Sequence, residues 1–128
     1  MTEISLSAPK SIALVGASRD PSKPSNLVLR YLVSHGFTVY PVNPSADIIE
    51  GLKCYPSLLD IPFPVDIVDI FRPSADVPAI VDQAIAKKAG AIWMQEGIVN
   101  EAAAGKARKA GLKVVMGLCI MKEHRKLG

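Results

Sequence analysis

The residues best suited to chemistry lie in one polar segment, residues 16–26, which reads Gly-Ala-Ser-Arg-Asp-Pro-Ser-Lys-Pro-Ser-Asn. The segment joins an apolar run to a helical pattern, and the free N–H groups at a helix start favour an anion. Its glycine permits a tight turn, and its hydroxyls and cations can bind phosphate oxygens. We therefore interpret it as a phosphate-binding loop rather than a polar loop whose serines only cap a helix. The residues suited to phosphate are Gly16, Ser18, Arg19, Ser22, Lys23 and Ser25.

A nicotinamide dinucleotide is a less suitable ligand for this loop. The segment lacks the glycine spacing G-x-G-x-x-G of dinucleotide sites, and the Walker A pattern is absent as well. Dinucleotide sites also carry Asp or Glu at the end of the second strand. Here that end reads Pro41-Val-Asn-Pro44, and the first acid beyond it is Asp47. NAD(P) binding is kept as an alternative that these residues disfavour.

The other reactive side chains are scattered along the chain. Two histidines, His35 and His124, and two cysteines, Cys54 and Cys119, show no metal-ligand spacing, so no metal site is predicted. A Gly-x-Ser-x-Gly nucleophile motif is absent. We expect structural roles for the histidines, and we expect Glu96 to position backbone N–H groups near a ligand. No catalytic residue is assigned, although Glu96, His124 and Cys119 are the candidates if the protein is an enzyme.

Apolar runs and helical patterns alternate along the chain, which is typical of a parallel α/β sheet. Strands are expected at residues 11–15, 37–42, 65–71, 91–94 and 113–116, and helices at residues 24–35, after Ser74 and after Asn100. Ser74 and Asn100 are expected to cap the helices that follow them. Residues 51–56 are expected to form a loop, and residues 122–125 a tail motif that packs across the sheet. Right-handed crossovers between two half-units then predict a Rossmann-like three-layer domain with a five-stranded parallel sheet of order 3-2-1-4-5. At this length we expect one domain, residues 1–128.

Ligands of open α/β sheets bind beyond the carboxyl ends of the strands, where the strand order reverses. In the predicted order the reversal lies between the first and fourth strands. The segments at this edge are 16–25, 41–45, 71–73, 95–97 and 117–119. The edge therefore adds four candidate ligand-binding residues, which are Gln95, Glu96, Gly97 and Cys119. Cys119 could equally be packed in the core.

Composition narrows the class of protein further. Hydrophobic residues make up 49% of the 128 and charged residues 21%, as in globular chains. The chain lacks a signal-peptide pattern, and no apolar stretch reaches the ~18 residues of a membrane span. We therefore expect a cytoplasmic protein without membrane contact. The formal charge is +3, but basic residues are not interleaved with aromatic ones, so nucleic-acid binding is not predicted.

Six motifs in the same order connect the chain to a known family. They begin at Val15, Pro41, Glu50, Val65, Trp93 and Cys119 and read VGASRDPSKPS, PVNP, EGLKCY, VDIVDIFRP, WMQEG and CIMKEH. With these motifs the chain resembles the small CoA-binding proteins related to the N-terminal CoA-binding domain of the succinyl-CoA synthetase α subunit. One departure is Gly117-Leu-Cys119, where relatives usually carry Asp-Arg-Cys.

The resemblance implies a Rossmann-like fold that binds coenzyme A with its phosphates at the first loop. It implies that the pyrophosphate or 3′-phosphate site is lined by Gly16, Ala17, Ser18, Lys23 and Ser25. By the same resemblance Asn43 and Pro44 border the nucleotide, and the adenosine or pantetheine path follows Phe71, Arg72 and Pro73.

Together, these patterns favour a module that binds CoA or an acyl-CoA without catalysis of its own. Two alternatives from other classes stay open. One is an enzyme, or an enzyme subunit, that acts on an acyl-CoA. The other is an interaction module that has lost its ligand, against which the charged first loop argues. A protein partner or a homo-oligomer is compatible with each of them.

Overall fold

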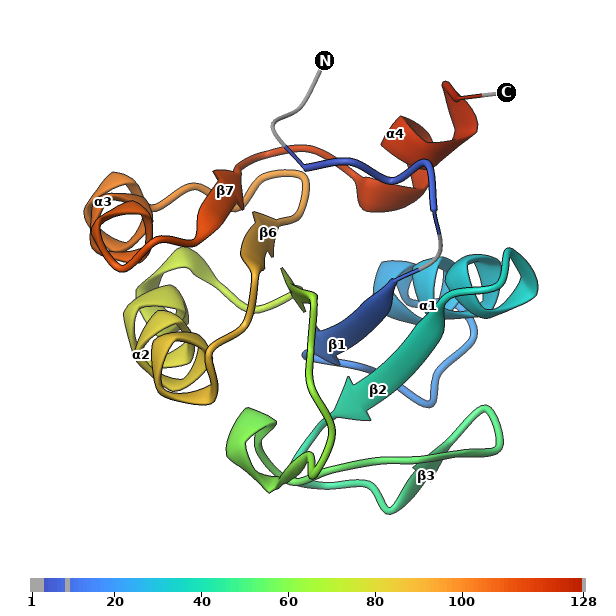
Figure 1. The fold of residues 1–128 in the computed structure, drawn as a ribbon. Coiled ribbons are helices and arrows are strands. Elements are labelled where there is room, and N and C mark those ends of the chain that lie inside the picture. The colour runs from blue at the N-terminus through green and yellow to red at the C-terminus, as the bar shows by residue number, and fades with distance from the viewer. Residues whose placement is uncertain (1–3, 9, 128) are drawn as a thin grey trace.

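The computed structural model describes residues 4–8 and 10–127, and a five-stranded parallel sheet lies at its centre (Figure 1). The strands of this sheet are β1 (Ser11–Val15), β2 (Thr38–Val42), β5 (Ile67–Ile70), β6 (Ala91–Met94) and β7 (Lys113–Val115). The helices are α1 (Pro24–Ser34), α2 (Val77–Lys87), α3 (Glu101–Lys109) and α4 (Ile120–Arg125), with short 3-10 helices η1 (Leu58–Asp60) and η2 (Ser74–Asp76). A small hairpin of β3 (Ile48–Ile49) and β4 (Leu52–Lys53) completes the list.

The predicted fold class is confirmed: the protein is α/β and Rossmann-like, with a five-stranded parallel sheet between helices. The order of the strands differs from 3-2-1-4-5 in the position of one strand. Counted along the chain, the five strands lie in the order 2-1-3-4-5, because the third, β5, pairs with β1 instead of lying outside β2. The reversal point accordingly moves from between the first and fourth strands to between β1 and β5.

Pro41 gives the physical reason for this order. A proline lacks the N–H that a strand donates to its neighbour, so it is tolerated in an edge strand and costs a hydrogen bond in a central one. In the observed order β2 is the edge strand, whereas the predicted order would have placed it between two neighbours. By contrast, all four residues of β5 are buried, as expected for a central strand.

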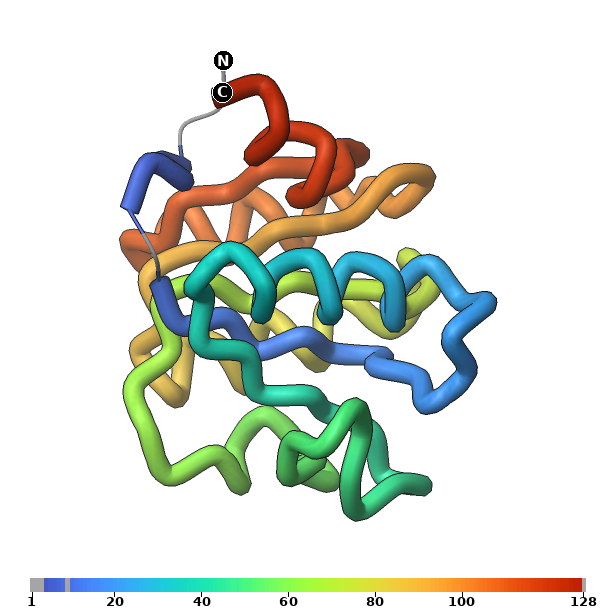
Figure 2. The backbone as a smooth tube through the Cα atoms, turned by 90° about the vertical axis from the view of Figure 1, so that its right-hand side faces the viewer, coloured from blue at the N-terminus to red at the C-terminus, as the bar shows by residue number. Residues whose placement is uncertain are grey.

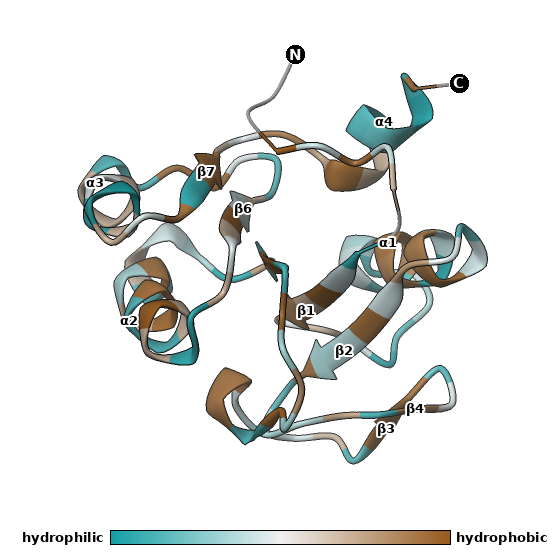
Figure 3. Cartoon of the chain, viewed as in Figure 1, coloured by the Kyte–Doolittle hydropathy of each residue, from teal (hydrophilic) through white to brown (hydrophobic). Residues whose placement is uncertain are grey.

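Two apolar layers enclose the sheet. Helices α1 and α4 cover one face, where Leu14, Leu32 and Trp93 are buried, and helices α2 and α3 cover the other face. In Figure 3 hydrophobic residues recur along the strands, with more hydrophilic bands in β2 and β7, while much of α4 and parts of α3 are hydrophilic. This distribution follows from the amphipathic pattern of each helix, whose apolar side is buried against the strands.

The structure adds two elements that sequence patterns did not predict. The hairpin β3–β4 falls in a stretch expected to be a loop, and its two-residue strands are too short for an alternating pattern to show. Helix α4 falls in a segment expected only as a tail motif that packs across the sheet, and its Ile120 and Met121 are buried under that face.

The two expected helix caps have different outcomes. Asn100 caps α3 as predicted, since its side chain accepts a hydrogen bond from the Ala103 amide. Ser74 does not cap α2, because its hydroxyl donates to the Val99 carbonyl across the sheet edge instead. The Ser74–Val99 bond and a second bond, from Asn100 Nδ2 to the Ser74 carbonyl at 3.0 Å, help to hold the loop after β6 next to the loop after β5.

The ligand edge of the sheet is visible in Figure 2. The loops that follow β1, β2 and β6 project from the same side of the molecule, on the right in that view. This arrangement is required by parallel strands, whose carboxyl ends all lie at one edge. Residues from the loops after β1, β2 and β6, which are separate parts of the sequence, therefore meet at this edge.

Candidate functional site

A cleft of about 1010 Å³ opens beyond the carboxyl ends of β1, β2 and β5. It lies at the point where the strand order reverses, between β1 and β5, as the topological rule requires. Most of the residues predicted to bind a ligand line this cleft: Gly16, Ala17, Ser18, Lys23, Ser25, Asn43, Pro44, Phe71 and Arg72. The structure thus brings together the two loops and the strand end that sequence reasoning had named separately.

Gly16 places the first loop directly against the end of β5. Its φ is +91°, a conformation that side chains rarely adopt, and a Cβ atom added there would lie 2.8 Å from the Phe71 carbonyl oxygen. The amides of Gly16 and Ala17 both donate to the Val42 carbonyl, at 3.1 and 3.2 Å. The loop therefore begins in a fixed position between β2 and β5.

Two asparagine side chains bind carbonyl groups of this loop. Asn43 Nδ2 donates to the Ala17 carbonyl and Asn26 Nδ2 donates to the Ser18 carbonyl, each at 2.8 Å. Across the described ranges 4–8 and 10–127, the amides of Ser18 and Arg19 make no hydrogen bond. With the carbonyls occupied and these amides free, the loop is suited to binding an anion.

Asn26 was missed by sequence reasoning. It is fully buried in the first turn of α1, where Arg30 Nε donates to its Oδ1 at 2.8 Å and its Nδ2 also reaches Glu50. The signal that could have revealed it is an amide side chain directly after the loop, at a position flanked by residues of the buried helix face. A buried polar group of this kind normally has a specific partner.

The charges around the cleft are arranged by local contacts. Arg72 Nη2 lies 2.8 Å from Asp76 Oδ2, and both side chains are about half exposed at the rim of the cleft. Asp20 accepts hydrogen bonds from the amide and hydroxyl of Ser22, and these bonds lower the pKa of its carboxyl group. Lys23 lines the cleft as a cation, while Arg19 belongs to the same loop but lies outside the lining.

A second cavity of about 320 Å³ continues from the cleft, on the sheet face that α1 and α4 cover. Pro24 and Phe71 border both spaces. Three further predicted residues, Gln95, Glu96 and Cys119, line this cavity. Pro73 and Gly97, like Arg19, line neither of the two spaces.

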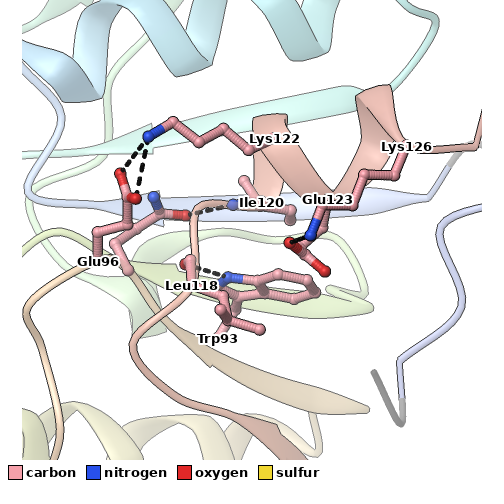
Figure 4. A network of polar contacts seen from close by, with 8 residues as sticks. Trp93, Glu96, Leu118, Ile120, Lys122, Glu123 and Lys126 are labelled. Carbon is pink, nitrogen blue, oxygen red and sulfur yellow. Dashed lines mark hydrogen bonds and ion pairs between the residues drawn. The ribbon is translucent and has the colours of Figure 1, made fainter. Parts of the chain in front are cut away.

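A network of polar contacts holds the far wall of the second cavity (Figure 4). Lys122 Nζ lies 3.0 Å from Glu96 Oε2, and the Trp93 indole N–H donates to the Leu118 carbonyl at 2.8 Å. Gln95 Oε1 accepts from the Ile120 amide at 3.1 Å. Glu96 was expected to position backbone N–H groups, but its carboxylate instead forms an ion pair with α4.

The two cysteines are both buried but lie in different surroundings. Burial raises the pKa of the Cys54 thiol, and a hydrogen bond with the backbone of Asn43 partly opposes this effect. Cys119 is 6% exposed, as expected for a residue packed in the core, and it also lines the second cavity. The two positions expected for Cys119 are therefore compatible.

The histidines are not isolated in the folded chain. The rings of His35 and His124 lie 5.4 Å apart, and Tyr31 hydrogen-bonds to His124 Nδ1 at 2.7 Å. These contacts join the end of α1 to α4, which agrees with the structural role expected for both residues. Among the described residues, no three His, Cys, Asp or Glu side chains form a group that could hold a metal ion.

None of the helices in the described part of the chain has the combination of length and apolar character that a bilayer crossing demands.

Comparison with known proteins agrees with this arrangement. The chain is 37% identical over 115 residues to the uncharacterized protein YneT of Bacillus subtilis, covering 90% of this chain and 85% of that protein. A hypothetical protein from Pyrococcus horikoshii OT3 of known structure superimposes with a TM-score of 0.91 at 46% identity, over 94% of this chain and 85% of that chain.

A longer relative is an enzyme. Acetate–CoA ligase [ADP-forming] II of Archaeoglobus fulgidus is 43% identical over 100 residues, which cover 76% of this chain and 15% of the ligase. The chain therefore spans only a small part of that ligase.

The fold and the loop after β1 define a Rossmann-like α/β protein with a cleft at the reversal point of its sheet. The particular family is shown by a family model, described as the CoA binding domain, that matches residues 10–125. The chain belongs to this CoA-binding domain family, and the resemblance drawn from the six motifs is confirmed.

Proposed function

We propose that this protein binds coenzyme A, free or as an acyl-CoA, in the cleft and in the cavity that continues from it. The observation that carries the proposal is the convergence of the first loop, Asn43 and Phe71 on one cleft at the reversal point of the sheet. Membership of the CoA-binding domain family supports the identity of the ligand. The phosphates would lie at the first loop, where Lys23 and the free amides of Ser18 and Arg19 are available.

The remainder of the CoA molecule would run from the first loop toward β6. Phe71 borders both spaces, so an arm that leaves the phosphates passes this ring before it enters the second cavity. In our proposal the pantetheine arm follows this path and the thiol end lies near Gln95 and Cys119.

Binding rather than catalysis is the function that these side chains support best. The charged groups beside the second cavity, Glu96 and Lys122, are paired with each other. At the rim of the cleft, Arg72 is paired with Asp76 in the same way. We therefore propose that this chain presents or stores CoA and does not itself transform it.

Ligand-induced stabilisation tests the proposal, because a ligand raises the melting temperature of the state that it binds. CoA should raise Tm more than NAD or NADP at the same concentration. An equal or larger shift with NAD would reverse the assignment. Dephospho-CoA should give a smaller shift if Lys23 or Arg19 contacts the 3′-phosphate, and an equal shift would assign both side chains to other groups.

A further inference from the structure

The second cavity differs from the cleft in the side chains that surround it. Its walls are formed largely by apolar residues from α1, the loop after β6 and α4, among them Leu27, Val28, Ile98 and Met121. A volume of about 320 Å³ is at the lower end of the range for small-molecule sites. It is suited to the end of a flexible arm with a short apolar group, and it is small for a long fatty chain.

One buried polar group faces this apolar space. Gln95 is 4% exposed, and its Oε1 accepts a hydrogen bond from the Ile120 amide. Because that amide can only donate, the orientation of the Gln95 side chain is determined and its Nε2 points elsewhere. No group among residues 4–8 and 10–127 accepts a hydrogen bond from this nitrogen. The nitrogen is not fully enclosed either, because in this part of the chain only the Asp69 carboxylate oxygens are both enclosed and without a partner. A donor at the wall of an apolar cavity is best satisfied by an acceptor that enters with a ligand.

The rim of the cavity has charged groups but little net charge. Glu96 and Lys122 lie at the rim, each more than half exposed, and their charges cancel across 3.0 Å. A charged ligand group would find no free side chain of opposite charge at this rim, and it would lose its hydration on entering an apolar space. The cavity is therefore matched to an uncharged group.

We propose that the second cavity receives the acyl group of a short, uncharged acyl-CoA, and that Gln95 Nε2 donates a hydrogen bond to the thioester carbonyl. This inference rests on the proposed function, since the thioester reaches the cavity only if the CoA phosphates lie in the cleft. It identifies the ligand class as short aliphatic thioesters, with acetyl-CoA and butyryl-CoA as representatives. The carbonyl supplies the acceptor that Gln95 lacks, and the aliphatic chain contacts Leu27 and Ile98.

Isothermal titration of the unmodified protein with a ligand series tests the inference. Acetyl-CoA and butyryl-CoA should bind about tenfold more tightly than CoA, because each buries a chain and satisfies the donor. Succinyl-CoA should bind no more tightly than CoA, since its carboxylate is charged. S-butyl-CoA, a thioether with the same chain but no carbonyl, should bind about tenfold more weakly than butyryl-CoA.

A matched pair of variants on α1 tests the position of the acyl group. Leu27 lines the cavity and is 45% exposed, whereas Val33 is 43% exposed on the same helix and lines neither space. Leu27→Trp should fill the cavity and lower butyryl-CoA affinity about tenfold, with a smaller effect on CoA. Val33→Trp should leave both affinities unchanged. The partial exposure of both sites allows the larger ring without disturbing the core.

The outcomes separate the two proposals. If CoA binds but its thioesters bind equally well, or if the thioether binds as tightly as butyryl-CoA, the acyl site is overturned and the CoA site stands. If succinyl-CoA binds as tightly as butyryl-CoA, the restriction to uncharged groups is overturned. If neither CoA nor any thioester binds, both proposals are overturned.

Discussion

The cleft and the cavity beside it share Phe71 and Pro24, yet they are built from different kinds of contacts. The cleft combines apolar side chains, such as Leu58 and Ile80, with the polar first loop, whose carbonyls are bound by Asn26 and Asn43. The cavity is formed by apolar side chains, and the polar groups at its wall mainly bind one another. The cleft is suited to a charged ligand group and the cavity to an uncharged one. A ligand with one charged end and one uncharged end can therefore occupy both.

The cleft and the cavity also differ in the substitutions that they can tolerate. Backbone-based binding depends on exact positions of the chain, and a single added carbon can disturb it. An apolar cavity depends on volume and adapts more easily to a change of side chain. The predictions below test this contrast, beginning with the largest expected effect.

The largest effect is expected at Gly16, in the cleft. Gly16→Ala adds a Cβ 2.8 Å from the Phe71 carbonyl oxygen at a φ of +91°. The strained backbone and the close contact together should lower the free energy of unfolding by about 2–5 kcal/mol. Urea denaturation measures the change, and CoA affinity should fall in the same variant.

Gly97 provides the matched control for this substitution. It also has a positive φ, +80°, but an added Cβ would have no neighbour within 4 Å. Gly97→Ala should therefore cost only the backbone strain, about 1–2 kcal/mol. Equal losses at the two glycines would show that the contact with β5 contributes nothing.

At Asp69 we expect a substitution to stabilise the protein, because this residue is a polar group in the apolar layer that α1 and α4 cover. It is fully buried in β5 between Leu14 and Trp93, and its two carboxylate oxygens have no hydrogen-bond partner among the residues that the structure describes. Burial raises the pKa of Asp69 well above its ordinary value. Asp69→Leu should therefore stabilise the protein at pH 7, by about 1–3 kcal/mol.

The pH dependence of unfolding provides the check. Since the folded state binds the Asp69 proton more tightly than the unfolded state, its stability should fall as pH rises from the ordinary pKa toward the raised one. Asp69→Leu should remove this fall. Asp20 has a lowered pKa in the polar loop, so its contribution has the opposite sign and is lost on acidification. A stability difference between wild type and Asp69→Leu that did not change with pH would contradict the buried, protonated state.

Lys23 tests the charge of the cleft without altering its backbone. Lys23→Ala should weaken CoA binding by about 1–3 kcal/mol, the range for a charge-assisted hydrogen bond, with little change in stability. Ser18→Ala should have a smaller effect because a neutral hydroxyl contact is weaker. Isothermal titration gives both values, and Lys109→Ala, on α3, is the control for loss of a surface charge. An unaltered affinity in Lys23→Ala would assign the phosphates to the loop amides and hydroxyls alone.

The smallest effect is expected from the chemistry of Cys119 in the second cavity. If the CoA thiol lies there, incubation with CoA disulfide should let the Cys119 thiolate attack it, forming a mixed disulfide and releasing one CoA thiolate. The reaction should be slow because Cys119 is only 6% exposed. Intact-protein mass spectrometry detects the adduct.

The second cysteine is the internal control for this reaction. Cys54→Ser should keep the adduct, because burial raises the pKa of Cys54 and leaves little thiolate to react. Cys119→Ser should lose it. An adduct that persists in Cys119→Ser and disappears in Cys54→Ser would place the CoA thiol elsewhere.

The sequence alone determined the fold class and the first loop of the site. Apolar runs alternating with helical patterns have few solutions other than a parallel α/β sheet, and the boundaries of β1 and β6 follow directly from their apolar runs. The loop at residues 16–26 was identifiable because its residues are contiguous. Residues that are neighbours in sequence are also close in space, so a site that they form together can be predicted from the sequence pattern.

Only the tertiary structure decided which distant residues meet. The orders 3-2-1-4-5 and 2-1-3-4-5 satisfy the same local pattern, and the pairing of β5 with β1 is what brings Phe71 against Gly16. The same holds for Asn26 with the Ser18 carbonyl and for Glu96 with Lys122. These contacts depend on strand pairing and helix packing between separate parts of the chain, which composition and periodicity leave open even where a single residue, such as Pro41, favours one arrangement.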